Sequence, residues 1–159
     1  MSKNPRILIT GGAGFIGTNF AHLVSRKYPN YEIIIVDKLN QQGRRENLKD
    51  IEDRIEFHEF DLIEEDKLRP IFEQGIDYVA HFAAETNVDR SIEDPDSFVS
   101  SNVDATNILL RLSRDFKVQR FHHVSTDEVF GELSLDPNIK FNEETPYDPR
   151  SPYSATKAA

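Results

Sequence analysis

The sequence predicts an α/β fold built on a doubly wound parallel sheet that is incomplete at its C-terminus. Three features support this prediction. Short apolar runs alternate with helical patterns along the 159 residues, as expected for a parallel sheet crossed by helices. Gly11, Gly14 and Gly17 follow the first apolar run and allow a tight turn into a helix. Asp37 ends the second apolar run, 20 residues after Gly17.

Five strands are expected, each a short apolar segment bounded by polar or turn residues: 6–10, 31–37, 55–60, 76–84 and 120–125. The segment YEIIIVD at 31–37 is too apolar for a surface strand, so both of its faces should be buried. For strands alternating with helices in this way, the expected strand order is 3-2-1-4-5.

The first helix follows the glycine turn. It should end near Lys27 and bury Ile16, Phe20, Leu23 and Val24, which share one helical face. The polar segment at 41–53 that comes after the second strand is expected to contain a short helix at most.

The later helices carry proline and capping signals. Pro70 is tolerated best in a first turn, so the next helix should begin near Leu68. A long helix at 96–114 places one polar residue, Asn102, on an apolar stripe, where it should satisfy backbone groups near the sheet. The other members of the stripe are Phe98, Ala105, Leu109 and Leu112. Ser151 and Pro152 are typical of the N-cap and first residue of a final helix.

The glycine turn and Asp37 together indicate a dinucleotide site. Gly14 has no side chain, so its backbone can approach a pyrophosphate, and Gly17 lets the helix pack close to the strand. N–H groups at the helix N-terminus then face the phosphates. A carboxylate at Asp37 accepts hydrogen bonds from the ribose hydroxyls of NAD and repels the 2′-phosphate of NADP. NAD is therefore expected, although Lys38 and two arginines follow in the sequence.

Two groups of residues could carry chemistry. Tyr153 and Lys157 form a YxxxK pair that points one way on a helix. An ammonium beside a phenol lowers the pKa of the phenol, which can then take a hydroxyl proton while hydride leaves for a nicotinamide. Thr126, Asp127 and Glu128 follow the fifth strand, at the end where open α/β sheets bind ligands. Adjacent carboxylates can serve as acid and base, although these residues alone favour a polar turn that caps the strand.

Composition excludes several classes of protein. The net charge of −9 argues against nucleic acid as a partner. The absence of cysteine excludes disulfides, thiolate catalysis and cysteine-based zinc sites. The five histidines have no metal-ligand spacing, so no metal is expected. No apolar run reaches about 18 residues and no secretory signal pattern precedes the first strand, so we expect a soluble cytoplasmic protein without a membrane partner.

The chain resembles the extended short-chain dehydrogenase/reductases in four segments: TGGAGFIG at 10–17, HFAAETNVDRSI at 81–92, STDEVFGE at 125–132 and SPYSATKAA at 151–159. The first and last segments are shared across that superfamily and imply a Rossmann-like fold with NAD as cofactor. The Thr-Asp-Glu run at 126–128 resembles the active site of the members that dehydrate nucleotide sugars. The resemblance thus implies a nucleotide-sugar 4,6-dehydratase, an NAD-dependent lyase.

The same resemblance implies residue roles. Tyr153, assisted by Lys157, would take the proton of the sugar C4 hydroxyl while the C4 hydride reduces NAD. Glu128 would remove the C5 proton, and Asp127 would protonate the departing C6 hydroxyl. Hydride returned to C6 would complete a 4-keto-6-deoxy sugar, and Thr126 would hydrogen-bond the sugar near C4.

The implied contacts form three sets. Substrate contacts are implied for Thr86, Thr126, Asp127 and Glu128. Contacts to the phosphates and the adenosine are implied for Gly11, Gly14, Phe15, Ile16, Gly17, Asp37, Lys38, Leu39, Asn40, Asp61 and Leu62. Contacts on the nicotinamide side are implied for Phe82, Ala83, Ala84, Thr86, Ser101, Tyr153 and Lys157.

Two other functions stay open: a UDP-sugar epimerase or decarboxylase of the same superfamily, and a non-catalytic NAD-binding module. Members of the superfamily continue well past the YxxxK pair. Residues 1–159 are therefore expected to be the NAD-binding domain, with the substrate-binding C-terminal part absent and activity in the truncated chain not assured. The resemblance also implies a homodimer in the full-length form, with the helix at 96–114 as a candidate interface. The choice between thymine and uracil nucleotides stays open.

Overall fold

The computed structural model describes residues 4–40, 42–135 and 138–159. The chain divides into two compact units. The first unit contains the described residues up to Ala83 together with residues 105–124, and the second contains residues 84–104 and the described residues from 125 to 159.

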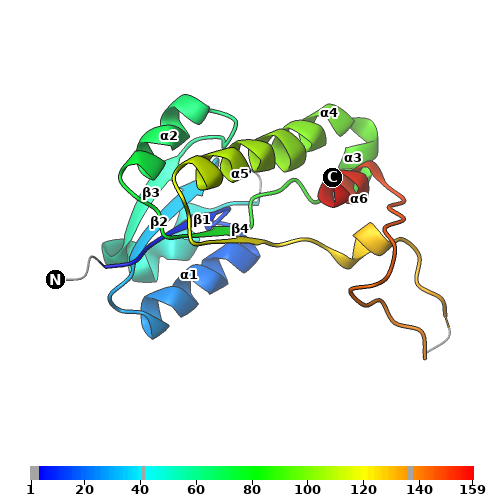
Figure 1. Cartoon of the computed structure of the whole chain (residues 1–159), viewed down its shortest axis with the longest axis horizontal. Helices are drawn as coiled ribbons and strands as arrows, with labels where there is room; N and C mark the ends of the chain where they lie inside the picture. Colours follow the sequence, from blue (N-terminus) through cyan, green and yellow to red (C-terminus); the bar gives the residue numbers. More distant parts are fainter. Residues whose placement is uncertain (1–3, 41, 136–137) are drawn as a thin grey trace. The chain divides into compact units, whose positions relative to one another are not determined.

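A parallel sheet forms the centre of the first unit (Figure 1). Its strands are β1 (Arg6–Thr10), β2 (Glu32–Asp37), β3 (Ile55–Glu59), β4 (Tyr78–His81) and β5 (Arg120–His123). They lie in the order β3-β2-β1-β4-β5, which confirms the predicted order. β4 is shorter than predicted because its partner β1 ends at Thr10, which pairs with His81, and the glycine turn begins there.

Helices cover both faces of this sheet. α1 (Phe15–Lys27) lies on one face, and α2 (Glu65–Glu73) and α5 (Ala105–Asp115) lie on the other (Figure 1). The short helix expected in the polar segment is a 3₁₀-helical segment, η1 (Arg45–Arg54). Its Leu48 and Ile51 join the buried cluster that also contains Ala21 and Val24 of α1.

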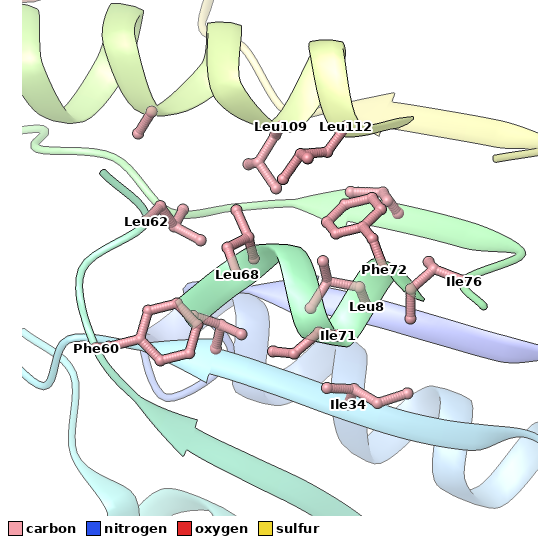
Figure 2. Close-up of a cluster of buried hydrophobic side chains, with 13 residues drawn as sticks. Leu8, Ile34, Phe60, Leu62, Leu68, Ile71, Phe72, Ile76, Leu109 and Leu112 are labelled. Carbon is pink, nitrogen blue, oxygen red and sulfur yellow. The ribbon is translucent and has the colours of Figure 1, made fainter. Parts of the chain in front are cut away.

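A second buried cluster fills the space between the sheet, α2 and α5 (Figure 2). Leu8 and Ile34 reach it from the sheet, Leu68 and Phe72 from α2 and Leu109 from α5, each at most 1% exposed. Burying a side chain of this kind contributes roughly 1.5–3 kcal/mol. The apolar stripe predicted for the long helix is confirmed, because Ala105, Leu109 and Leu112 are buried here.

The buried face of α1 differs from the prediction. Ile16 is 61% exposed and Leu23 is 47% exposed. Val24 is buried as predicted, and Phe20 packs partly buried against the same side of the sheet. Gly17 and Ala21, rather than Ile16 and Leu23, complete the buried face. The cause is Gly17, where an added Cβ would lie 2.2 Å from a carbonyl oxygen of the glycine turn. The helix packs so closely there that small residues, not the larger apolar ones, face the sheet.

The predicted start of α2 near Leu68 is wrong. The helix begins at Glu65, and Pro70 lies inside it. The carbonyl of Glu64 accepts hydrogen bonds from the N–H groups of Lys67 and Leu68, which forms the first turn earlier. Two acidic residues in this turn suit the positive end of the helix dipole. Pro70 is exposed, and its lack of an N–H removes one hydrogen bond within the helix.

The second unit is built from short helical segments: α3 (Val88–Glu93), α4 (Pro95–Phe98), the π-helical turn η2 (Val99–Asp104), the 3₁₀ segment η3 (Asp127–Phe130) and α6 (Pro152–Ala158). The predicted long helix therefore contains a π-helical turn. Ser151 caps α6 and Ser154 returns a hydrogen bond to it, a capping box that confirms the predicted start. A helix of this length depends on tertiary contacts.

Candidate functional site

The glycine turn connects β1 to α1 in a shape that side chains would prevent. Gly11 has a φ of +68°, and a Cβ there would lie 2.6 Å from the backbone nitrogen of Ala83. Gly14 is the N-cap of α1, so the first N–H groups of the helix have no capping side chain from that position. Phe15 and Ile16, which follow it, are 83% and 61% exposed. Backbone donors at a helix N-terminus form an anion-binding site.

Asp37 lies at the end of β2, beside this turn. Its Oδ2 accepts a hydrogen bond from the N–H of Ala13 at 2.9 Å, and its Oδ1 accepts one from the N–H of Leu39 at 2.9 Å. The residue is 8% exposed. Each carboxylate oxygen can accept a further hydrogen bond, so the group remains able to bind hydroxyls. Arg45, which follows Asp37 by eight residues in the sequence, lies over the ring of Phe57 and pairs with Glu52, so its charge is engaged there.

The remaining residues predicted to contact adenosine differ in their placement. Lys38 and Asp61 form an ion pair at 3.2 Å, so these two lie together after β2 and β3. Asn40 accepts a hydrogen bond from the backbone of Gln42. Leu62 is 6% exposed and belongs to the buried cluster of Figure 2. Its side chain packs inward, so a ligand contact would have to come from its backbone.

Phe82 and Ala83, predicted for the nicotinamide side, follow β4 in the first unit. Phe82 packs against Phe20 of α1, with ring centroids 5.1 Å apart. Ala83 approaches Gly11 through its backbone. The first unit therefore brings together the glycine turn, Asp37, the Lys38–Asp61 pair and the end of β4. This arrangement fits a dinucleotide, because the glycine turn and the helix N–H groups suit a pyrophosphate and the carboxylate on β2 suits a ribose.

The other predicted contacts, Ala84, Thr86 and Ser101, lie in the second unit, where Asn102 organises the backbone. Its amide accepts from the N–H of Glu85 at 2.8 Å and donates to the carbonyl of Glu85 at 3.0 Å. It also donates to the Thr156 hydroxyl at 3.0 Å. The prediction that Asn102 satisfies backbone groups is confirmed, and these groups belong to Glu85, four residues after the end of β4.

The second unit also brings the predicted acid–base residues together. Thr126 is the N-cap of η3, and its hydroxyl accepts a hydrogen bond from the N–H of Glu128 at 3.3 Å. The same hydroxyl hydrogen-bonds to the phenol of Tyr153 on α6. Asp127 and Glu128 are exposed, and their charges act on that phenol. The expectation of an ordinary strand-capping turn therefore misses the proximity of both carboxylates to Tyr153.

The pKa directions differ from the simple expectation for a YxxxK pair. Burial raises the pKa of Tyr153, and its hydrogen bond with Thr126 opposes that change. The negative charges of Glu128 and Asp127 raise the pKa further. Burial lowers the pKa of Lys157 from its usual 10.5 to about 8. The pKa of Tyr153 thus responds to burial, to Thr126 and to the two carboxylates.

One supporting residue was missed by sequence reasoning. Thr156 is buried beside Lys157 on α6, and its hydroxyl donates to the carbonyl of Tyr153 at 2.7 Å while accepting from Asn102. It lies within the YxxxK motif, but no pattern there distinguishes it from a surface residue. Only the packing of α6 against η2 indicates its role.

Within residues 4–40, 42–135 and 138–159, no helix is long and apolar enough to cross a membrane. No three or more His, Asp or Glu side chains in the same ranges are grouped so that they could hold a metal ion.

Fold and site define a Rossmann-type α/β protein with the glycine turn and acidic β2 residue of dinucleotide-binding domains. The chain belongs to the family described as GDP-mannose 4,6 dehydratase, whose profile matches residues 8–159. This result confirms the sequence resemblance to the sugar-nucleotide branch of the extended short-chain dehydrogenase/reductases.

Relatives of known identity support the same grouping. The chain is 46% identical over 153 residues to a dTDP-glucose 4,6-dehydratase of Mycobacterium tuberculosis (strain CDC 1551 / Oshkosh), covering 96% of this chain and 46% of the relative. It is 48% identical over 154 residues to that of Mycolicibacterium smegmatis, covering 97% and 46%. The chain thus spans about half the length of the curated relatives it matches.

Solved structures agree with the fold. The dTDP-glucose 4,6-dehydratase DesIV of Streptomyces venezuelae, with NAD and TYD bound, aligns with a TM-score of 0.88 and 40% identity, covering 96% of this chain and 48% of that one. The UDP-glucose 4-epimerase of Thermus thermophilus, in complex with NAD, aligns with a TM-score of 0.86 and 31% identity, covering 96% and 47%. The predicted Rossmann-like fold is confirmed.

Proposed function

We propose that this chain is the NAD-binding part of a dTDP-glucose 4,6-dehydratase. The observation that carries the proposal is the grouping of Thr126, Asp127, Glu128 and Tyr153 in the second unit, where a hydrogen bond and two carboxylate charges act on one phenol. Dehydration of a sugar needs a base at a hydroxyl, a second base at carbon and an acid at a leaving hydroxyl. These side chains supply the three kinds of group.

NAD, when bound, supplies a hydride acceptor that later returns the hydride. The first unit would hold it: helix N–H groups after Gly14 suit the pyrophosphate, and Asp37 suits the adenosine ribose. Because Asp37 is a carboxylate, it would disfavour the 2′-phosphate of NADP. The NAD-bound dehydratase and epimerase structures that align with this chain support the choice.

The proton transfers would fall to the second unit. Tyr153 would take the C4 hydroxyl proton as the C4–H bond breaks, with Thr126 hydrogen-bonded to the same phenol. The resulting ketone acidifies the C5 proton, which Glu128 would remove. Asp127, in protonated form, would give its proton to the C6 hydroxyl, which leaves as water.

The compartment, the oligomeric state and the substrate are properties of the whole protein. We place that protein in the cytoplasm, as a homodimer that acts on a nucleotide sugar rather than on nucleic acid. The net charge of −9 supports the last point. The share of each relative that this chain covers supports a longer native polypeptide. The base of the nucleotide would be read by residues outside the chain.

The test uses the full-length protein with dTDP-glucose. We expect a product lighter by one water, with no net consumption of NAD. In Glu128→Gln, oxidation at C4 should survive while dehydration falls by roughly 10²–10⁴-fold, the usual contribution of a positioned acid or base. Glu132→Gln, an exposed residue of the following loop, is the matched control. Unchanged turnover in Glu128→Gln would remove Glu128 from the mechanism.

The alignment with UDP-glucose 4-epimerases supports a second candidate in the same superfamily. The mass of the product separates the candidates, because an epimerase yields an isomer and a decarboxylase releases CO2. The intact mass of the native polypeptide tests the remaining alternative, a non-catalytic NAD-binding module. A mass well above that of 159 residues favours the enzyme, and a mass equal to it favours a non-catalytic NAD-binding module.

A further inference from the structure

The glycine turn is braced by a segment that no dinucleotide motif includes. Residues 43–48 follow β2 and comprise the two residues before η1 and the first four residues of η1. Leu48 anchors this segment, since it is 1% exposed and lies in the cluster on the α1 side of the sheet. The segment thereby has a fixed position next to the turn.

Three hydrogen bonds connect Ala13, in the middle of the glycine turn, to its surroundings. Its carbonyl accepts from the N–H of Arg44 at 3.1 Å and from the side-chain amide of Asn47 at 3.0 Å. Its N–H donates to Asp37 at 2.9 Å. The peptide groups on both sides of Ala13 are therefore held by residues 24 or more positions away.

Asn47 is itself held by α1. Its backbone carbonyl accepts from the hydroxyl of Thr18 at 3.2 Å and contacts Nε2 of His22 at 3.0 Å. The bonds form a closed circuit that runs from the turn to Asn47, from Asn47 to α1, and from α1 back to the turn. Gly43 completes the fit, because a Cβ at this position would lie 2.7 Å from the Asp37 carboxylate.

Such a circuit limits the positions that the turn can adopt before a ligand arrives. A turn that is already ordered loses less conformational entropy when it binds a pyrophosphate. The donors in question are backbone N–H groups, which cannot move independently of the turn. A side chain that orders the turn therefore raises affinity without touching the ligand.

We infer that Asn47 is a positioning residue for dinucleotide binding, because its side-chain amide holds the Ala13 carbonyl and fixes the glycine turn. The inference rests on the NAD binding proposed above. Asn47 is exposed as a whole residue, so its amide contributes little to global stability. Its effect should appear in affinity and in local order, not in the unfolding midpoint.

The test compares Asn47→Asp with Asn30→Asp in the full-length protein. Aspartate has the shape of asparagine but cannot donate to a carbonyl, and Asn30 is an exposed residue outside the turn that controls for the added charge. We expect the Kd for NAD, measured by calorimetry, to rise roughly two- to tenfold in Asn47→Asp, the range for one lost hydrogen bond. Hydrogen exchange at the N–H groups of Ala13 and Arg44 should quicken, with the thermal midpoint unchanged.

A second pair of variants, both at Thr18, keeps the inference testable if Asn47→Asp misfolds. Thr18→Val removes the hydroxyl that holds Asn47, whereas Thr18→Ser keeps it, so only the valine variant should weaken NAD binding. Equal affinity and equal exchange in Asn47→Asp and Asn30→Asp would overturn the inference. If the unsubstituted full-length protein does not bind NAD, the proposed function fails. The exchange rates at Ala13 and Arg44 then decide by themselves whether Asn47 orders the turn.

Discussion

Replacing Asn102 with alanine tests the centre of the second unit. The substitution removes hydrogen bonds of 2.8, 3.0 and 3.0 Å to the N–H and carbonyl of Glu85 and to the hydroxyl of Thr156. Thr156 keeps its bond to the Tyr153 carbonyl. The backbone groups of Glu85 lose their side-chain partner in a buried region, because Asn102 is 4% exposed.

The size of the effect follows from those two backbone groups. Each buried polar group left without a partner costs about 1–3 kcal/mol, and water entering the small space would recover part of this. We therefore expect Asn102→Ala to lower the free energy of unfolding by about 3 kcal/mol. Thr156 and α6 should become less ordered at the same time, since Asn102 is what joins them to Glu85.

Urea unfolding followed by far-ultraviolet circular dichroism measures this free energy. Asn107→Ala is the matched control, because Asn107 lies on the following helix, α5, and is exposed. Surface substitutions of this kind usually change stability by less than about 0.5 kcal/mol. A difference between the two variants below about 1 kcal/mol would refute the reasoning that Asn102 satisfies buried groups at a net gain.

Two more predictions concern the glycine turn and α6. Gly17→Ala should destabilise the protein by about 1–3 kcal/mol, because the added Cβ would lie 2.2 Å from the carbonyl oxygen of Gly11. In Gly14→Ala the added Cβ would lie 3.4 Å from the same oxygen, so this variant should fold normally and lose only NAD affinity. Thermal unfolding and calorimetry check both; equal stability of the two variants would contradict the packing argument. Competitive amine labelling should give Lys157 a pH midpoint near 8, while Lys67, whose pKa is raised by Glu64, should react only at higher pH. Unfolding returns the pKa of Lys157 from about 8 to 10.5, so between pH 8 and 10.5 the unfolded state binds more protons than the folded state. The free energy of unfolding should therefore rise with pH across this range through Lys157. A Lys157 midpoint no lower than that of Lys67 would contradict its burial.

Much of the fold could be predicted because parallel strands carry a local signal. Strands buried on both faces are continuous apolar runs, and β1 and β2 have this pattern. Crossovers between parallel strands have one hand, which leaves few possible strand orders. The glycines and Asp37 also sit at fixed distances along the chain, so the sequence alone indicated where a dinucleotide would bind.

The buried face of α1 and the start of α2 could not be predicted from local patterns. Helical periodicity correctly favoured Val24, but it also favoured Ile16 and Leu23, whereas close packing at Gly17 buries Gly17 and Ala21. Pro70 indicated a helix start that the first-turn hydrogen bonds of α2 override. In both cases the deciding contact lies between elements or in backbone geometry that residue types do not encode.

By itself, the sequence determined the five strands, their order in the sheet and the residues at which β1 and β2 end. Only the tertiary structure decided how those residues are held. It brings the amide of Asn47 to the carbonyl of Ala13. It also brings Thr126 and the carboxylates of Asp127 and Glu128 to the phenol of Tyr153. The physical reason is the separation of the interacting groups along the sequence. An apolar run is a property of neighbouring residues, whereas these hydrogen bonds and pKa values depend on groups that only the folded chain brings within a few ångströms of one another.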